Sequence, residues 1–97
     1  MIIVHDIFIA KPGNASKLAK LFKEVMSGMD GMTDIMTDMT GQYNRVVMVS
    51  KYENLAAYEQ SFEKYKQQSD ELKEMMEKMK GYTDMYLTGS REIYQVW

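Results

Sequence analysis

The order of residue patterns is the feature that most constrains how this chain can fold. Along the 97 residues the patterns are strand, helix, strand, strand, helix and strand, with few residues left between them. β-Branched and aromatic residues at 2–10 predict the first strand. Pro12 and Gly13 end it, because proline removes an amide donor and glycine permits a turn. Asn14 can cap the helix that follows. The apolar residues of this helix, three and four apart, form one stripe: Leu18, Leu21, Phe22, Val25, Met26 and Met29.

A hairpin is predicted in the middle of the chain. Residues 33–40 alternate apolar with acidic side chains, which predicts a strand with one solvent-exposed face. A turn at residues 41–42 and a valine-rich return strand at residues 43–52 complete the hairpin.

The second helical region spans residues 54–79, where apolar residues again recur three and four apart. One continuous helix of this length would extend roughly 40 Å, longer than strands of ordinary length can cover. Ser69, followed by two acidic residues, predicts the start of a second segment, with a bend near Gln67. Residues 82–97 form the predicted last strand, with a bulge or break at residues 89–90.

These elements predict an α+β fold and an assembly. Two strand-helix-strand units with right-handed crossovers give a four-stranded antiparallel sheet with both helices on one face, in one domain over residues 1–97. Both sides of the first strand are largely apolar, with Ile3 and Ile7 on one side and Val4 and Phe8 on the other. A solvated face would be more polar, so we expect a second copy to pack on the open face as a twofold homodimer. The alternative is a monomer with an apolar sheet surface.

Charge and composition exclude several partners. The formal net charge is −2 and acidic and basic residues are interspersed, so we expect no nucleic acid partner. The chain has no cysteine, which excludes disulfides and thiolate metal sites. Residues 1–6 lack the pattern of an export signal, and no run approaches the ~20 apolar residues of a membrane span. We therefore expect a cytoplasmic protein with no membrane partner.

Four segments, in this order and spacing, carry a resemblance to a known family: residues 7–13 (IFIAKPG), 41–47 (GQYNRVV), 52–58 (YENLAAY) and 89–94 (GSREIY). Over its whole length the chain resembles NIPSNAP-like members of the dimeric α+β-barrel superfamily. The resemblance implies a ferredoxin-like β-α-β-β-α-β domain, two sheets that form a barrel with helices outside, and a small cavity within. Relatives include antibiotic-biosynthesis-type monooxygenases and haem-degrading enzymes.

The chain departs from these relatives at two positions. NIPSNAP-like sequences often place an arginine two residues before an aromatic residue in the first strand, whereas this chain has Asp6 before Phe8. An anion-binding role for that arginine is therefore not implied. Haem-degrading relatives use a histidine on a helix, whereas His5 lies in a strand. We expect neither haem nor another cofactor.

His5 and Arg45 are the candidate catalytic residues. His5 can act as a general base or proton relay, since the ordinary histidine pKa lies near 6.5; the alternative is a hydrogen-bonded structural histidine. Arg45, in an apolar strand, can bind a carboxylate or enolate oxygen. Its alternative is a salt bridge to Asp38 or Glu92 across the sheet.

Aromatic residues on the strands suggest a pocket for a planar organic molecule, although a dimer interface would fit them equally well. Trp97 is expected at the subunit boundary. The predicted substrate-binding residues are Asp6, Phe8, Tyr43, Tyr94 and Trp97.

Methionine is unusually frequent, with 11 residues. Met26, Met32 and Met39 belong to a spaced series that resembles Cu(I) thioether clusters. The series crosses a helix end, a turn and a strand, so its members need not converge, and we predict no metal site. Flexible core filling, or adaptable walls for an apolar ligand, explains these residues more simply.

Two functional hypotheses follow. The first is a homodimer whose inter-sheet cavity binds a small apolar or carbonyl-bearing molecule and oxidises it without a cofactor, as monooxygenase-like relatives do. The second is a non-catalytic dimerisation or interaction module. A polar-lined void favours the first hypothesis, and a dry, close-packed interface favours the second.

Overall fold

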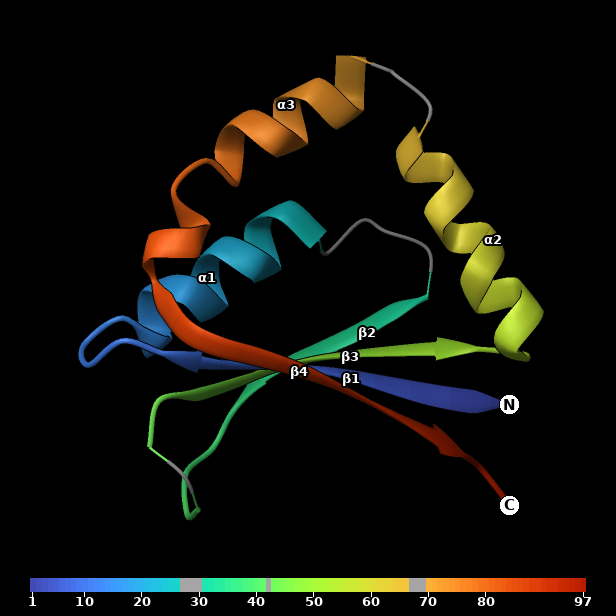
Figure 1. Ribbon diagram of the computed structural model, residues 1–97, viewed down its shortest axis with the longest axis horizontal. Helices are drawn as coiled ribbons and strands as arrows, with labels where there is room; N and C mark the ends of the chain where they lie inside the picture. Colours follow the sequence, from blue (N-terminus) through green and yellow to red (C-terminus); the bar gives the residue numbers. More distant parts are fainter. Residues whose placement is uncertain (27–30, 42, 67–69) are drawn as a thin grey trace.

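The computed structural model describes residues 1–26, 31–41, 43–66 and 70–97. One four-stranded antiparallel sheet has the strand order β2-β3-β1-β4, and Figure 1 shows the helices on one side of it, with the other side bare. This confirms the predicted ferredoxin-like β-α-β-β-α-β architecture. The elements are β1 (Ile2–Ala10), α1 (Ala15–Met26), β2 (Met32–Thr37), β3 (Arg45–Tyr52), α2 (Leu55–Lys66), α3 (Asp70–Lys78), the 3-10 turn η1 (Tyr82–Asp84) and β4 (Tyr86–Gln95).

The hairpin strands are shorter than predicted. β2 ends at Thr37 because the Asp38 carboxylate accepts hydrogen bonds from the backbone N–H groups of Thr40 (2.9 Å) and Gly41 (2.6 Å), which turns the chain. β3 begins at Arg45 because Asn44 has a left-handed backbone with φ 65°. The predicted turn residue Gln42 lies outside the described residues.

The second helical region forms two helices, as predicted from its length. α2 and α3 run in different directions in Figure 1. The predicted bend at Gln67 and the cap at Ser69 lie outside the described residues. No helix among the described residues is long and apolar enough to cross a membrane.

Three details of the last strand differ from the prediction. The strand ends at Gln95, two residues before the predicted end at Trp97. Residues 82–84 form the 3-10 turn η1 instead of a strand, because Gly81 is left-handed (φ 88°) and its carbonyl accepts a hydrogen bond from Asp84 N–H (3.1 Å). The irregularity in pairing lies before Gly89. Ala10 pairs with Tyr86 and Ile9 with Thr88, so the extra residue is Leu87.

The main core lies between α1 and the sheet. Leu18 and Phe22 on α1 are fully buried, and they pack with Ala10 of β1 and Val46 and Met48 of β3. Their spacing of four residues places both side chains on one face of α1. Because strand residues alternate between faces, this packing assigns the even-numbered residues of β1 to the helix side of the sheet.

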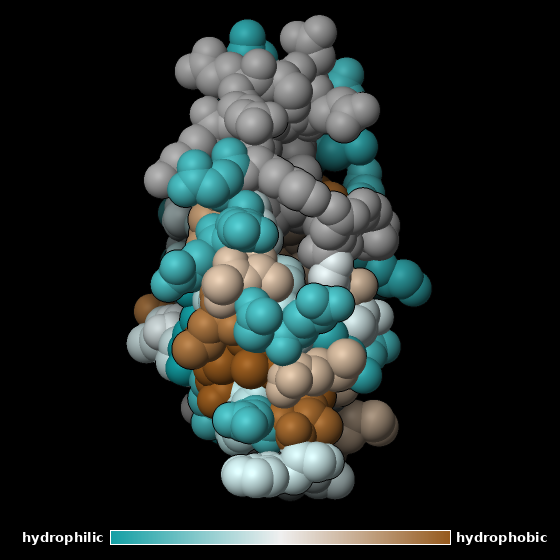
Figure 2. All heavy atoms as spheres, turned by 90° about the vertical axis from the view of Figure 1, so that its right-hand side faces the viewer, coloured by the Kyte–Doolittle hydropathy of each residue, from teal (hydrophilic) through white to brown (hydrophobic). Residues whose placement is uncertain are grey.

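The open face of the sheet also carries an apolar cluster at its centre. Ile7, Val47 and Val49 form a buried cluster there, flanked by Ile3 and Ile9. Figure 2 shows hydrophobic residues gathered in the lower part of the side that carries α2 and both chain ends. Each face of the sheet therefore carries an apolar cluster, which is the feature from which a second copy is predicted.

Candidate functional site

The sheet separates the site residues that the sequence predicts. The cross-strand register places His5, Arg45 and Tyr94 on the open face, while Asp6 and Phe8 face the helices. Tyr43, in the β2–β3 connection, is 88% exposed, and Trp97, beyond the end of β4, is fully exposed. The seven residues therefore do not form a single site within one chain.

The two predicted catalytic residues are also separated along the open face. His5 pairs with Val49, whereas Arg45 pairs with Ile9, four residues further along β1. That offset corresponds to roughly 13 Å between backbone positions. His5 instead contacts Tyr94, with ring centroids 5.4 Å apart and edge to face. Hydrogen bonding to Glu92 raises the pKa of Tyr94 above its ordinary value.

The helix side contains a cavity of about 310 Å³. It lies against the sheet beside α2 and the end of α1, and it includes the predicted residues Asp6 and Phe8. Its lining is mostly apolar, with a few polar groups: Asp6, Phe8, Met26, Met32, Met48, Ser50, Tyr52, Tyr58, Ser61, Phe62 and Arg91. Met26, Met32 and Met48 thus line the same cavity, where their flexible thioethers can adapt to a ligand.

An ion pair connects the two strands at this cavity. Arg91 on β4 donates a hydrogen bond from Nε to Oδ1 of Asp6 on β1 at 2.5 Å. This hydrogen bond to Asp6 is the main cause that raises the pKa of Arg91, so the guanidinium is always charged. The Arg91 Cζ also lies 5.7 Å from the ring centre of Tyr58 and 5.8 Å from that of Phe62, both on α2. Arg91 therefore links β1 and β4, on the sheet side of the cavity, to α2.

Tyr58 supplies the unusual group in this cavity. Its side chain is 8% exposed, and its hydroxyl is buried without a hydrogen bond of ordinary geometry to any described residue. Burial raises the pKa of this phenol, and the nearby Arg91 charge partly opposes that shift. The hydroxyl is thus protonated at neutral pH and can donate a hydrogen bond to a molecule in the cavity.

Arg91 and Tyr58 were not among the residues singled out from the sequence. Tyr58 belongs to the apolar stripe of the second helical region, where a core role explains it. Arg91 lies in the closing segment of the resemblance, 85 residues from Asp6. Its pairing with Asp6 follows only once the register of β1 with β4 is known. A charged residue on the helix-facing side of the last strand was the available signal.

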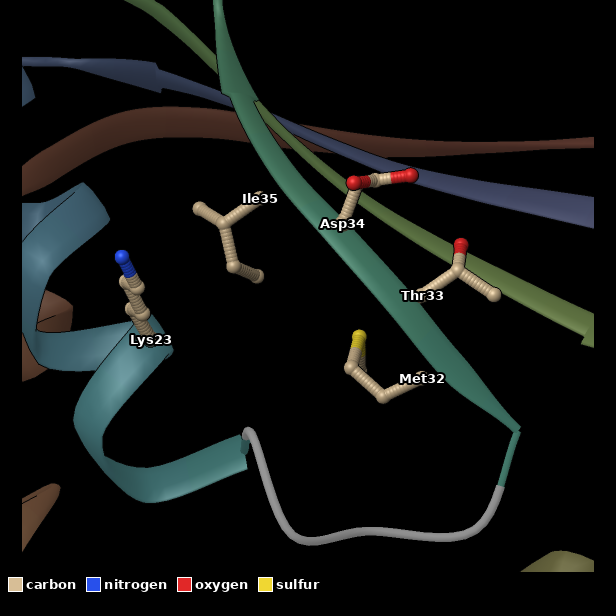
Figure 3. Close-up of a pocket in the computed structure, with 5 residues that line it drawn as sticks. All are labelled: Lys23, Met32, Thr33, Asp34 and Ile35. Carbon is tan, nitrogen blue, oxygen red and sulfur yellow. The ribbon is translucent and has the colours of Figure 1, made fainter.

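Two other hollows have no buried polar side-chain atom without a hydrogen bond among their described lining residues. One, of about 250 Å³, lies between α1 and β2, where Figure 3 shows Met32 and Ile35 directed toward α1 and Lys23, and Thr33 and Asp34 on the other side of the strand. The Thr33 hydroxyl donates to the carbonyl of Val49 at 3.1 Å and is thereby satisfied. The other, of about 570 Å³, is lined by Gly31, Lys51, Tyr52, Glu53, Ala57, Gln60 and Ser61 and is called the outer hollow below.

Comparisons with known proteins agree on the fold. No family model and no curated protein matches the chain. A NIPSNAP domain protein of known structure from Burkholderia xenovorans superposes with a TM-score of 0.79 at 10% identity, covering 100% of this chain and 95% of the other. A NIPSNAP-like domain protein from the same organism gives 0.78 at 18% identity, covering 99% and 84%. An antibiotic biosynthesis monooxygenase-like protein from Deinococcus radiodurans gives 0.61 at 15% identity, covering 100% and 93%. These likenesses confirm that the chain has the NIPSNAP-like, ferredoxin-like fold.

Proposed function

We propose that this protein binds a compact, mostly apolar molecule with a carbonyl oxygen in the cavity beside α2. The observation that carries the proposal is the buried Tyr58 hydroxyl, which makes no hydrogen bond of ordinary geometry to a described residue. Leaving a polar group buried and unpaired costs about 1–3 kcal/mol, and a ligand oxygen that accepts a hydrogen bond from this hydroxyl removes that cost. A mostly apolar cavity with a few convergent polar groups is the usual form of a small-molecule site.

Charge favours a neutral ligand. Asp6 and Arg91 neutralise one another at the cavity wall, and they are the two charged residues of its described lining. A carboxylate would compete with Asp6 for the guanidinium, whereas a carbonyl oxygen can accept from Tyr58 and from remaining Arg91 donors without separating the pair. The volume of about 310 Å³ is at the small end of the range for ligand pockets.

A binding experiment tests this proposal with 1-acetonaphthone, a bicyclic aromatic ketone, as the probe. Titration calorimetry on the purified protein is expected to give saturable binding that Tyr58→Phe weakens about tenfold, the value of one neutral hydrogen bond. Tyr86→Phe is the matched control: this tyrosine contacts Phe8 with ring centroids 5.0 Å apart but does not line the cavity. Equal affinities in all three proteins, or no saturable binding, would contradict the proposal.

Oxidation of the bound molecule by O₂ without a cofactor is the catalytic extension of the proposal. Asp6 is the carboxylate in the described cavity lining and can accept a proton from a CH₂ group next to the carbonyl. Tyr58 and Arg91 then stabilise the enolate oxygen. Reaction with O₂ converts the CH₂ group to a second carbonyl and releases one water. We expect oxygen uptake with 2-tetralone, a cyclic ketone that has a benzylic CH₂ group next to its carbonyl. We expect Asp6→Asn to abolish this uptake. Binding without oxygen uptake would leave a binding protein only.

The homodimer belongs to the same proposal. Its support is the apolar open face, where Met36 on β2 is 43% exposed beside its cross-strand partner Val47. Met36→Lys is expected to weaken self-association at least 100-fold by native mass spectrometry, because it buries an unpaired charge between two sheets. The matched control is Met39→Lys, since Met39 lies beyond β2 and is almost fully exposed. A wild-type protein that is monomeric at micromolar concentration would contradict the dimer and leave the cavity proposal standing.

A further inference from the structure

Tyr52, the last residue of β3, lines two spaces at once. Among the described residues, the cavity beside α2 and the outer hollow share the lining residues Tyr52 and Ser61. Ser61 is small, and its hydroxyl donates to the carbonyl of Tyr58 at 2.5 Å. The Tyr52 ring is therefore the larger part of the wall that the two spaces share.

The Tyr52 ring is held from two sides. On one side lies the ring of Tyr58, with centroids 5.1 Å apart. On the other lies Gly31, where an added Cβ would stand 2.8 Å from Cε1 of Tyr52, closer than atoms can approach. The Gly31 carbonyl accepts a hydrogen bond from Lys51 N–H at 2.8 Å, which fixes this glycine against the end of β3. Only a residue without a side chain leaves room for the ring at this point.

Tyr52 is partly buried and packs against Ile2, Val4 and Tyr58. Its position at the end of β3, paired with Ile2 at the start of β1, places it on the rigid sheet instead of on a loop. A wall on such a support keeps its place when a ligand binds, so it can discriminate between ligands of different length.

We infer that the Tyr52 ring is a length-selecting partition, which keeps the tail of a ligand in the cavity beside α2 out of the outer hollow. This inference rests on the proposed function. The cavity has about 310 Å³ and the outer hollow about 570 Å³, so removing the ring opens a larger space to the tail of a bound molecule. Tyr52 sets the maximum size of the substrate, while Tyr58 and Arg91 recognise its oxygen.

The test uses a homologous series of 1-phenyl-1-alkanones, from acetophenone to dodecanophenone. Wild-type affinity is expected to rise by about fourfold for each methylene that is buried, and then to fall once the tail meets the partition. Tyr52→Ala is expected to extend the rising part of the series by several methylenes and to bind octanophenone at least tenfold more tightly than the wild type. Tyr52→Phe, which keeps the ring, is the matched control and is expected to keep the wild-type limit.

Tyr52→Leu guards against loss of fold, because leucine retains apolar packing on Ile2 and Val4 but is shorter than the ring. If thermal melting shows that Tyr52→Ala is unfolded, Tyr52→Leu decides, with a smaller extension expected. A wild type that binds acetophenone, with one length limit shared by all variants, would overturn the partition and leave the proposed function intact. A wild type that binds no member of the series would overturn both.

Discussion

The two halves of the layer between the helices and the sheet are built differently. On the α1 side, Leu18 and Phe22 are fully buried in an apolar cluster with Ala10 and Val46. On the α2 side, Tyr58 is buried but Phe62 is 38% exposed, and a cavity with an ion pair separates the helix from part of the sheet. One sheet face therefore combines a packed half that stabilises the fold with a hollow half that can hold a ligand.

The difference follows from the residues on each helix. The α1 stripe consists of aliphatic and aromatic side chains without polar atoms, which fill space without requiring hydrogen bonds. The corresponding positions of α2 are Tyr58, Ser61 and Phe62. After α3, the chain returns to the packed half, where Met79, Tyr82 and Tyr86 join the α1 cluster. The packed half thus contains both α1 and the segment that follows α3.

The largest expected effect separates the two halves by stability. Phe22→Ala is expected to lower the free energy of unfolding by about 3–5 kcal/mol, because it removes a fully buried ring and leaves a cavity. Phe62→Ala, the same change on α2, is expected to cost about 1 kcal/mol or less, since this ring is already partly in solvent. Urea unfolding of both variants measures the difference. Equal losses would mean that α2 is packed as tightly as α1, against the comparison.

How much of this could be predicted from the sequence depends on the range of the interactions. The bounds of β1 and the stripe of α1 up to Met26 were predicted correctly because local propensity, a proline and 3.6-residue periodicity determine them. Met29, the last residue of the predicted stripe, lies outside the described residues. Alternation showed that both faces of β1 are apolar, but it did not tell which face the helices cover. The hairpin ends and η1 were missed because features of single residues shorten the strands. The Asp38 side chain accepts backbone hydrogen bonds, and Asn44 and Gly81 have left-handed backbones.

The candidate site could not be predicted because it depends on distant partners. Asp6 and Phe8 were predicted, but they were grouped with His5 and Arg45, which lie on the opposite face of the sheet. Asp6 meets Arg91 only through the pairing of the first and last strands. Tyr58 fits the apolar stripe of its helix so well that its hydroxyl gives no local signal. Periodicity assigns a residue to one face of its helix or strand, but the pairing of the strands determines which distant residues it contacts.

A second prediction sharpens the comparison through Tyr58. Tyr58→Phe is expected to raise the free energy of unfolding by about 1 kcal/mol, because it removes a buried hydroxyl that makes no hydrogen bond of ordinary geometry to a described residue. The same variant is expected to lose ligand affinity, so stability and binding change in opposite directions. Tyr86→Phe, in the packed half, is expected to be neutral. A loss of stability in Tyr58→Phe would indicate that the hydroxyl stabilises the unliganded protein.

The third prediction concerns pH. The pKa of Tyr58 is raised above 10.0 by burial, so the folded protein keeps this proton at a pH where the unfolded chain releases it. The stability associated with the proton is complete below pH 10 and is lost as the pH rises through the folded-state pKa. Melting temperatures measured from pH 9 to 11.5 are expected to fall more steeply in the wild type than in Tyr58→Phe. Parallel curves would contradict the buried position of the phenol.

The smallest effect on stability is expected for the ion pairs of the two halves, although their removal is expected to affect ligand binding differently. The ion pair of the packed half joins Glu24 Oε1 and Lys78 Nζ at 3.8 Å. We expect Asp6→Asn in the hollow half and Glu24→Gln in the packed half each to change the free energy of unfolding by about 1 kcal/mol or less. Both pairs include a side chain that is about half exposed. Only Asp6→Asn leaves an uncompensated guanidinium at the cavity.

Benzoate and acetophenone then distinguish the two variants, because the two probes differ mainly in the charge of the oxygen-bearing group. Asp6→Asn is expected to increase the affinity for benzoate about tenfold relative to acetophenone, since Arg91 no longer has a carboxylate partner in the protein. Glu24→Gln is expected to leave the ratio of affinities at its wild-type value. If Asp6→Asn also leaves the ratio unchanged, then Arg91 does not face the ligand, and the selectivity of the hollow half for neutral molecules must come from its apolar walls alone.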